Sequence, residues 1–153
     1  MEIAYDFLLK KAAAYCSKQE TCTADVETKL QTWGADAGQK EKIISYLVEQ
    51  KYIDNERFCR AFVNDKLRFN KWGKVKIVQA LRMKQIPDNI QQGVFGEMDV
   101  SLYEQILDEL LHKKVREIKA SGSYERRGKL LNFALQRGFE YAIAERLINK
   151  MSL

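Results

Sequence analysis

Hydrophobic and polar positions recur at helical spacing along the whole chain. Apolar residues follow one another three or four positions apart, the spacing that lines one face of an α-helix. One amphipathic segment is expected from about Ile3 to Lys18, and another from Thr23, which can cap it, to Gly34. No bounded run of five or six residues alternates apolar and polar positions, as a half-buried strand does. The pattern therefore predicts an all-α protein.

Residues suited to helix ends divide the rest of the chain. Asp36 and Gln39 form a capping box for a helix from Lys40 to about Gln50. Its expected core positions are Ile43, Ile44, Leu47 and Val48.

The middle of the chain predicts a long helix and two shorter ones. Asp54 can cap a helix that continues through the apolar Phe58, Phe62 and Val63 to about Asn70. Gly73 then interrupts the pattern, and the remaining helices are 74–81 and a short one that opens at Pro87.

The last third of the chain predicts three more helices. Ser101 and Glu104 form a second candidate capping box, for a helix through Val115. Ser121-Gly122-Ser123 is the clearest break. A helix up to Gln136 and a last one from Glu140 to about Lys150 follow, with Ile143, Leu147 and Ile148 expected to face inward.

Three short segments of the chain resemble one another. They are Lys29–Ala35, Ala80–Ile86 and Phe133–Phe139, in which Leu30, Leu81 and Ala134 are equivalent and lie 51 and 53 residues apart. The spacing predicts three tandem three-helix repeats, 1–52, 53–98 and 99–153, in one continuous repeat domain with an elongated or curved shape. The alternative is a single compact helical bundle.

The composition narrows the class of protein. Of 153 residues 46% are hydrophobic and 31% charged, which suits a folded domain. The three cysteines form no metal-binding or disulfide pattern, and His112 is the only histidine. We expect buried thiols, no metal, no cofactor, no catalytic site and no membrane segment, and therefore a cytoplasmic protein that is not an enzyme. Nothing in the repeats calls for more than a monomer.

The basic residues, in a chain of net charge +5, gather in two clusters. The first cluster contains Arg57, Arg60, Lys66, Arg68, Lys71, Lys74, Lys76, Arg82 and Lys84, with Trp72 among them. The second cluster contains Lys113, Lys114, Arg116, Lys119, Arg126, Arg127 and Lys129. Such segregation is typical of a surface that faces phosphate or an acidic groove, although charged helix faces are often simply solvated. Within the first cluster, Trp72 is either a base-stacking residue or, the favoured alternative, a packing anchor, and Arg57 is expected to pair with Asp54.

A hinge between two helices carries a family resemblance. The segment Lys51–Phe58, preceded by Ile43–Leu47, resembles the hallmark of the RecX family, bacterial regulators of the RecA recombinase, and Arg137-Gly138-Phe139 resembles its third-repeat signature. Lys51 and Gln85 stand where that family usually has Gly at a helix end, so each is expected to take a left-handed conformation or to end its helix differently.

The resemblance implies a function as well as a fold. It implies binding in the groove of a RecA–DNA filament and modulation, mostly inhibition, of ATPase, strand exchange and SOS and recombination activity. The two basic clusters are the expected contact residues, and DNA, single- or double-stranded, is an expected weak partner. The alternatives are a helical nucleic-acid-binding protein with no recombinase partner and a scaffold for an acidic protein.

Overall fold

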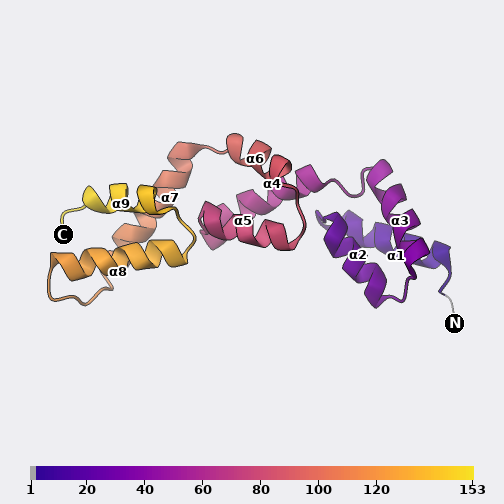
Figure 1. Ribbon diagram of the computed structural model, residues 1–153, viewed down its shortest axis with the longest axis horizontal. Helices are drawn as coiled ribbons and strands as arrows, with labels where there is room; N and C mark the ends of the chain where they lie inside the picture. Colours follow the sequence, from indigo (N-terminus) through magenta and orange to yellow (C-terminus); the bar gives the residue numbers. More distant parts are fainter. Residues whose placement is uncertain (1–2) are drawn as a thin grey trace. The chain divides into compact units, whose positions relative to one another are not determined.

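The computed structural model describes residues 3–153, and those residues form α-helices and one π-helical turn, with no strand (Figure 1). The elements are α1 (Tyr5–Lys18), α2 (Thr23–Thr32), α3 (Ala37–Glu49), α4 (Asn55–Asp65), the π-helical turn η1 (Lys66–Asn70), α5 (Lys74–Met83), α6 (Asp88–Gly96), α7 (Val100–Val115), α8 (Ser123–Gln136) and α9 (Tyr141–Asn149). The all-α prediction is confirmed, and the order of the elements fits three groups of three helices.

The chain forms two compact units, which are described separately. Unit 1 comprises the described residues up to Phe62 together with Leu81–Val94, and unit 2 comprises Val63–Ala80 together with Phe95–Leu153. The central cluster of unit 1 contains Leu8, Ala12, Cys16, Val26, Leu30, Ala35, Ile43, Leu47 and Ile53. Buried side chains of α7, α8 and α9 in unit 2 include Tyr103, Ile106, Leu107, Leu111, Leu130, Ala134, Ala144, Leu147 and Ile148. Helices α4, α5 and α6 contribute residues to both units.

The three segments that resemble one another in sequence adopt the same helix ending. In each, the carbonyl of the aligned residue accepts a hydrogen bond from the N–H five positions later, and the residue before that donor has positive φ. The donor and acceptor pairs are Ala35 to Leu30, Ile86 to Leu81 and Phe139 to Ala134. This arrangement satisfies carbonyls at a helix end that have no partner within the helix. The sequence repeat is therefore also a structural repeat.

Lys51 and Gln85 take the left-handed conformation in place of Gly. Their φ angles are 62° and 60°, whereas Gly34 and Gly138 have 89° and 94° at comparable helix ends. A side chain at positive φ brings Cβ close to the following carbonyl, at about 1–2 kcal/mol per residue. The helix endings are thus kept at a local cost in stability.

The predicted cap of α2 is wrong. The N-cap residue is Cys22 and makes no side-chain cap, and Thr23 is the first helical residue. Instead, Oδ1 of Asn55 accepts a hydrogen bond of 3.0 Å from the Thr23 backbone N–H. Because this acceptor lies 32 residues along the chain, on α4, local sequence rules do not reveal it.

The predicted capping box at the start of α7 is also wrong. The helix begins at Val100, and Asp99 caps it by accepting a 3.2 Å hydrogen bond from the N–H of Leu102. Ser101 and Glu104 therefore lie within the first turns of α7. Asp99, directly before the helix, is the residue that caps it.

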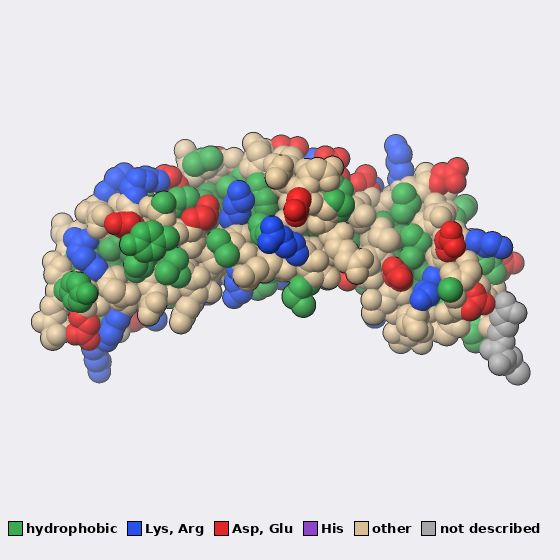
Figure 2. All heavy atoms as spheres, in the orientation of Figure 1, with side chains coloured by type: hydrophobic (Ala, Val, Ile, Leu, Met, Phe, Trp, Pro, Cys, Tyr) green, Lys and Arg blue, Asp and Glu red, His purple; other side chains and the backbone are tan. Residues whose placement is uncertain are grey.

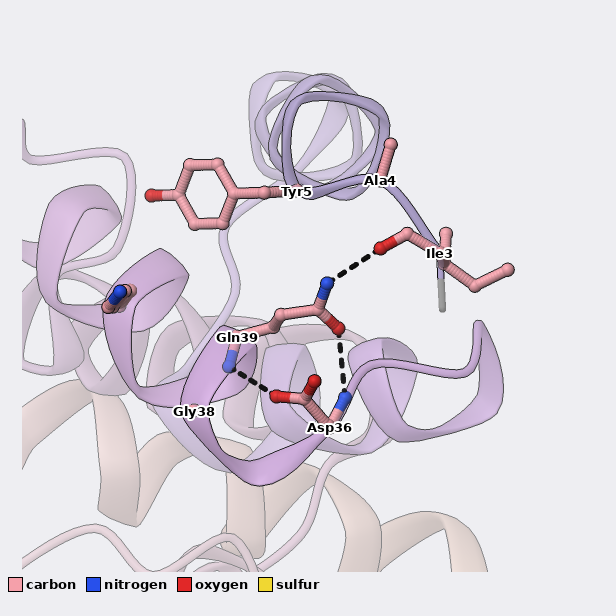
Figure 3. A pocket seen from close by; sticks show the side chains of 7 residues that line it. Ile3, Ala4, Tyr5, Asp36, Gly38 and Gln39 are labelled. Carbon is pink, nitrogen blue, oxygen red and sulfur yellow. Dashed lines mark hydrogen bonds between the residues drawn. The ribbon is translucent and has the colours of Figure 1, made fainter. Parts of the chain in front are cut away.

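Gln39 completes the predicted box at the start of α3 and also holds the N-terminal segment. Its backbone N–H donates to Asp36 Oδ1 at 2.8 Å, and its side-chain oxygen accepts from the Asp36 N–H at 3.0 Å. Its Nε2 donates to the carbonyl of Ile3 at 2.6 Å, beside an open depression of about 500 Å³ (Figure 3). These contacts explain why a polar Gln is buried.

The buried face of α3 is narrower than predicted. Ile43 and Leu47 are fully buried, Ile44 is half-buried, and Val48 is exposed, so its assignment to the core is wrong. Val48 follows Leu47 by one residue, which turns its side chain about 100° away from the buried stripe.

Candidate functional site

Unit 2 carries the whole positive excess of the chain. It has 15 Lys and Arg against 10 Asp and Glu, whereas residues 1–62 and 81–94 of the sequence together have 11 of each. The division separates the first basic cluster, because Arg57, Arg60, Arg82 and Lys84 belong to unit 1 and the remaining members to unit 2. All members of the second cluster belong to unit 2.

Acidic partners balance the four basic residues of the first cluster that lie in unit 1. Their ion pairs include Arg57 to Glu20 at 2.6 Å, Arg60 to Glu56 at 3.6 Å, Arg82 to Asp88 at 3.7 Å, and Lys84 to Asp25 at 2.9 Å. Their charges are therefore already matched within the unit, which makes them weak candidates for binding an external anion.

Arg57 has a different partner from the predicted one. Its guanidinium pairs with Glu20, and this hydrogen bond raises the pKa of Arg57. Asp54 instead accepts a 3.0 Å hydrogen bond from the Arg57 backbone N–H, which confirms Asp54 as the cap of α4. The structural role expected for Arg57 is kept, because its Nη2 also donates to the carbonyl of Lys51 at 3.1 Å.

Two lysines of the first cluster that lie in unit 2 contact the ring of Trp72. The ammonium groups of Lys66 and Lys76 lie 4.8 and 4.7 Å from the centre of the Trp72 ring. Two cation–π contacts of this kind fix both lysines relative to the indole. The ring therefore orders two cations, and whether Trp72 also stacks on a base stays a prediction.

Four basic residues of the stretch 66–76 have no acidic partner among the described residues. Arg68 donates to the neutral side chain of Asn64 at 2.7 Å, and the Lys74 ammonium lies over Phe95 at 5.1 Å. Within residues 3–153, neither of these residues nor Lys71 nor Lys76 forms an ion pair. An external anion would not need to break any salt bridge in order to contact them.

The second cluster is only partly neutralised. Lys114 pairs with Glu117 at 3.7 Å and Lys129 with Glu125 at 3.2 Å. Arg127 donates to the neutral Asn149 at 2.8 Å. The members that form no ion pair with a described residue are Lys113, Arg116, Lys119, Arg126 and Arg127. On the face drawn in Figure 2, basic side chains over α7, α8 and α9 stand apart, with apolar and acidic side chains between them.

Backbone hydrogen bonds hold the basic segment, residues 66–76, against the turn between α8 and α9. The N–H of Gly73 donates to the carbonyl of Arg137 at 2.7 Å, and the N–H of Val75 donates to that of Gly138 at 2.9 Å. A Cβ at Gly73 would lie 2.3 Å from the backbone of Gly138. The approach therefore requires glycine at position 73.

Two side chains reinforce the same junction. Arg137 donates to the carbonyls of Asn70 and Lys71 at 2.6 and 3.2 Å, while its Nε is buried without a partner. The buried Tyr103 hydroxyl accepts from the N–H of Lys74 at 2.9 Å and donates to Glu140. Burial, together with that hydrogen bond to Glu140, raises the pKa of Tyr103, so its hydroxyl stays protonated. The basic segment is thus held in place by α7 and by the turn between α8 and α9.

Two exposed aromatic residues escaped the sequence prediction. Phe69 in η1 is 78% exposed and Tyr124 at the start of α8 is 93% exposed. Phe69 directly follows Arg68, and Tyr124 lies two residues before Arg126, so nearby basic residues were the available signal in the sequence. Neither ring belongs to a buried stripe.

None of the helices within residues 3–153 has the length and apolar character of a membrane span. In the same part of the chain, no three or more His, Cys, Asp or Glu side chains lie close enough together to hold a metal ion.

Comparisons with known proteins agree with the fold. The family model "RecX, second three-helix domain" matches residues 54–94, and "RecX, third three-helix domain" matches residues 103–148. A crystal structure of RecX from Lactobacillus salivarius superimposes with a TM-score of 0.86 at 21% identity, and covers 95% of each chain. A second crystal structure, of a regulatory protein RecX, gives 0.83 at 20% identity, over 95% of this chain and 74% of that one.

Curated relatives carry the same family name. A regulatory protein RecX from Lactobacillus johnsonii is 26% identical over 95% of this chain and 54% of its own length. One from Chlorobium limicola is 27% identical over 72% of this chain and 68% of its own length. The chain thus spans only about half to two thirds of these relatives. With both domain models matched in order, the chain belongs to the RecX family of regulatory proteins.

Proposed function

We propose that this protein regulates the RecA recombinase without catalysing a reaction itself. It binds in the groove of the RecA–DNA filament, as a cytoplasmic monomer, and mostly inhibits ATPase and strand exchange, with consequences for recombination and the SOS response. Membership of the RecX family is the observation that carries the proposal. The regulatory name of the relatives supports it.

The charge distribution supports a binding role for unit 2. Its cations without acidic partners gather around Trp72 and along the second cluster, and phosphates or carboxylates of a filament can neutralise them. The principal contacts in this proposal are Arg68, Lys71, Lys74, Lys76, Lys113, Arg116, Lys119, Arg126 and Arg127. The ion-paired residues of unit 1 serve mainly its own fold.

The proposal is tested by the single-stranded-DNA-dependent ATPase rate of the cognate RecA, measured with increasing amounts of this protein. A parallel titration on bare single-stranded DNA gives the amount that coats the DNA. We expect inhibition well below that amount. Inhibition that begins only when the bare DNA is saturated would contradict the proposal.

That second outcome would favour the alternative, a helical nucleic-acid-binding protein with no recombinase partner. The observation that favours this alternative is the exposed ring of Phe69, which lies in a segment rich in cations. Such a protein binds bare nucleic acid as tightly as the filament and loses affinity steeply with salt.

A further inference from the structure

The exposed ring of Phe69 lies in a segment rich in cations. The stretch from Lys66 to Lys76 contains five basic residues and no acidic one. Phe69 is 78% exposed, although an apolar ring of that size is usually buried. Within the part of the chain that the structure describes, the ring makes no aromatic and no cation–π contact. It is therefore free to pack against a ligand.

Local geometry accounts for this exposure. Val63 and Leu67 are buried at 4% and 3% exposure and define the inner face of the helix. Phe69 follows Leu67 by two residues, which at about 100° per residue places it on the opposite face. It belongs to η1, and π-helical turns of this kind are rare and frequent at functional sites.

The turn that carries Phe69 is fixed rather than loose. The N–H of Trp72 donates to the carbonyl of Lys66 at 3.0 Å, and the N–H of Lys71 donates to the same carbonyl. Arg137 holds the carbonyls of Asn70 and Lys71 from the α8–α9 turn. Ordering of this segment on binding therefore costs little entropy, which favours a preformed contact.

The chemistry around the ring selects a class of ligand. Single strands of nucleic acid are bound where cations follow the phosphates and aromatic side chains stack on the bases. Two lysine ammonium groups already lie 4.8 and 4.7 Å from the centre of the Trp72 ring, whereas the ring of Phe69 is 78% exposed and has no such contact with a described residue. An acidic peptide would match the charges but would give the ring no aromatic base to stack on.

From these observations we infer that Phe69 stacks on a base of a single-stranded nucleic acid, while Arg68, Lys71 and Lys76 contact its phosphates. The inference rests on the proposed function only in taking DNA as a partner. It assigns the contact to a residue outside the two basic clusters.

The test compares two fluorescent single strands, oligothymidine and an abasic sugar–phosphate chain of the same length. Binding of the full chain is followed by anisotropy at low salt, without RecA. We expect tighter binding to oligothymidine than to the abasic strand. Phe69→Ala should weaken binding to oligothymidine by about 5-fold or more and leave the abasic strand unaffected, because only the former has bases to stack.

Two further variants make the result specific. Phe69→Tyr keeps an aromatic ring and should retain the preference for oligothymidine. Phe7→Ala removes a ring that is 58% exposed, on α1 in the charge-balanced unit 1, and should change neither affinity.

An equal loss on both strands, or no loss on either, would overturn the inference. It would also be overturned if polyglutamate bound as tightly as oligothymidine and lost as much affinity from Phe69→Ala, since the ring would then serve an acidic peptide. Base-dependent binding through Phe69 without any effect on the RecA ATPase would refute the proposed function and leave this inference intact. Inhibition of RecA without base-dependent binding would refute this inference and leave the proposed function intact.

Discussion

Gly73→Ala should separate the basic segment from the turn between α8 and α9 in unit 2. The added Cβ would lie 2.3 Å from the carbonyl carbon of Gly138 and 2.3 Å from the nitrogen of Phe139, both backbone atoms that cannot rotate away. Relief of that overlap must separate the two segments, which breaks the hydrogen bonds from Gly73 to Arg137 and from Val75 to Gly138.

The magnitude follows from those losses. Each hydrogen bond contributes about 1 kcal/mol, and overpacking of a well-packed site adds about 1–3 kcal/mol, so unit 2 should lose about 3–5 kcal/mol of its free energy of unfolding. Small domains have about 5–15 kcal/mol in total. The change therefore removes a large part of the stability of unit 2.

Urea unfolding followed by tryptophan fluorescence measures this loss. A Trp33→Phe background leaves Trp72, next to Gly73, as the sole tryptophan, so the signal reports on unit 2. Gly128→Ala is the matched control, because a Cβ there meets no atom within 4 Å. Inside α8 it should raise stability by about 0.5–1 kcal/mol. The reasoning would be refuted if the Gly73→Ala variant unfolded at the same urea concentration as the Trp33→Phe protein that lacks this change.

Three further predictions concern local features. Lys51→Gly should raise the free energy of unfolding by about 0.5–1 kcal/mol, since it removes left-handed strain at some cost in backbone entropy. Lys51→Ala keeps the Cβ and should bring no such gain. The urea midpoints of the two variants and the wild type test this. Hydrogen bonds from Ser121 and the ion pair with Lys129 lower the pKa of Glu125 from 4.5 to about 2, so its small stabilising effect is complete above pH 4.5 and lost as the pH falls through 2. The melting temperatures of wild type and Glu125→Gln should therefore differ at pH 6 and converge near pH 2; a constant difference would contradict this. Burial raises the pKa of Cys59 to about 11, and all three cysteines are buried, so a thiol reagent at pH 8 should label the protein only after denaturation.

The repeat was predictable from the sequence because it depends on local chemistry. The segments that contain Leu30, Leu81 and Ala134 resemble one another in sequence, and the structure gives all three the same helix ending. The caps at Asp36 and Asp54 were also predicted correctly, since each carboxylate acts on an N–H three residues away.

Long-range partners could not be predicted in the same way. The cap of α2 comes from Asn55, and Glu20 pairs with Arg57 from 37 residues away. Charge clustering in the sequence therefore overestimated the first basic cluster, because acids distant in sequence neutralise its unit 1 members. The 17 predicted site residues remain a prediction, which these contacts narrow toward unit 2.

The cations of unit 2 are the proposed binding site for the filament. The most direct test of this proposal is the amount of protein needed for half-inhibition of the RecA ATPase, compared for wild type and the triple variant Arg68→Glu, Lys74→Glu and Lys76→Glu. The control variant reverses Lys10, Lys18 and Lys42, three exposed lysines of unit 1, and so changes the net charge equally. Circular dichroism verifies that both variants are folded.

Three surface contacts at about 0.5–1 kcal/mol each predict that the unit 2 variant needs at least about 10-fold more protein and that its inhibition depends less on salt. The control should match wild type. A folded unit 2 variant that inhibits as well as wild type would contradict the claim.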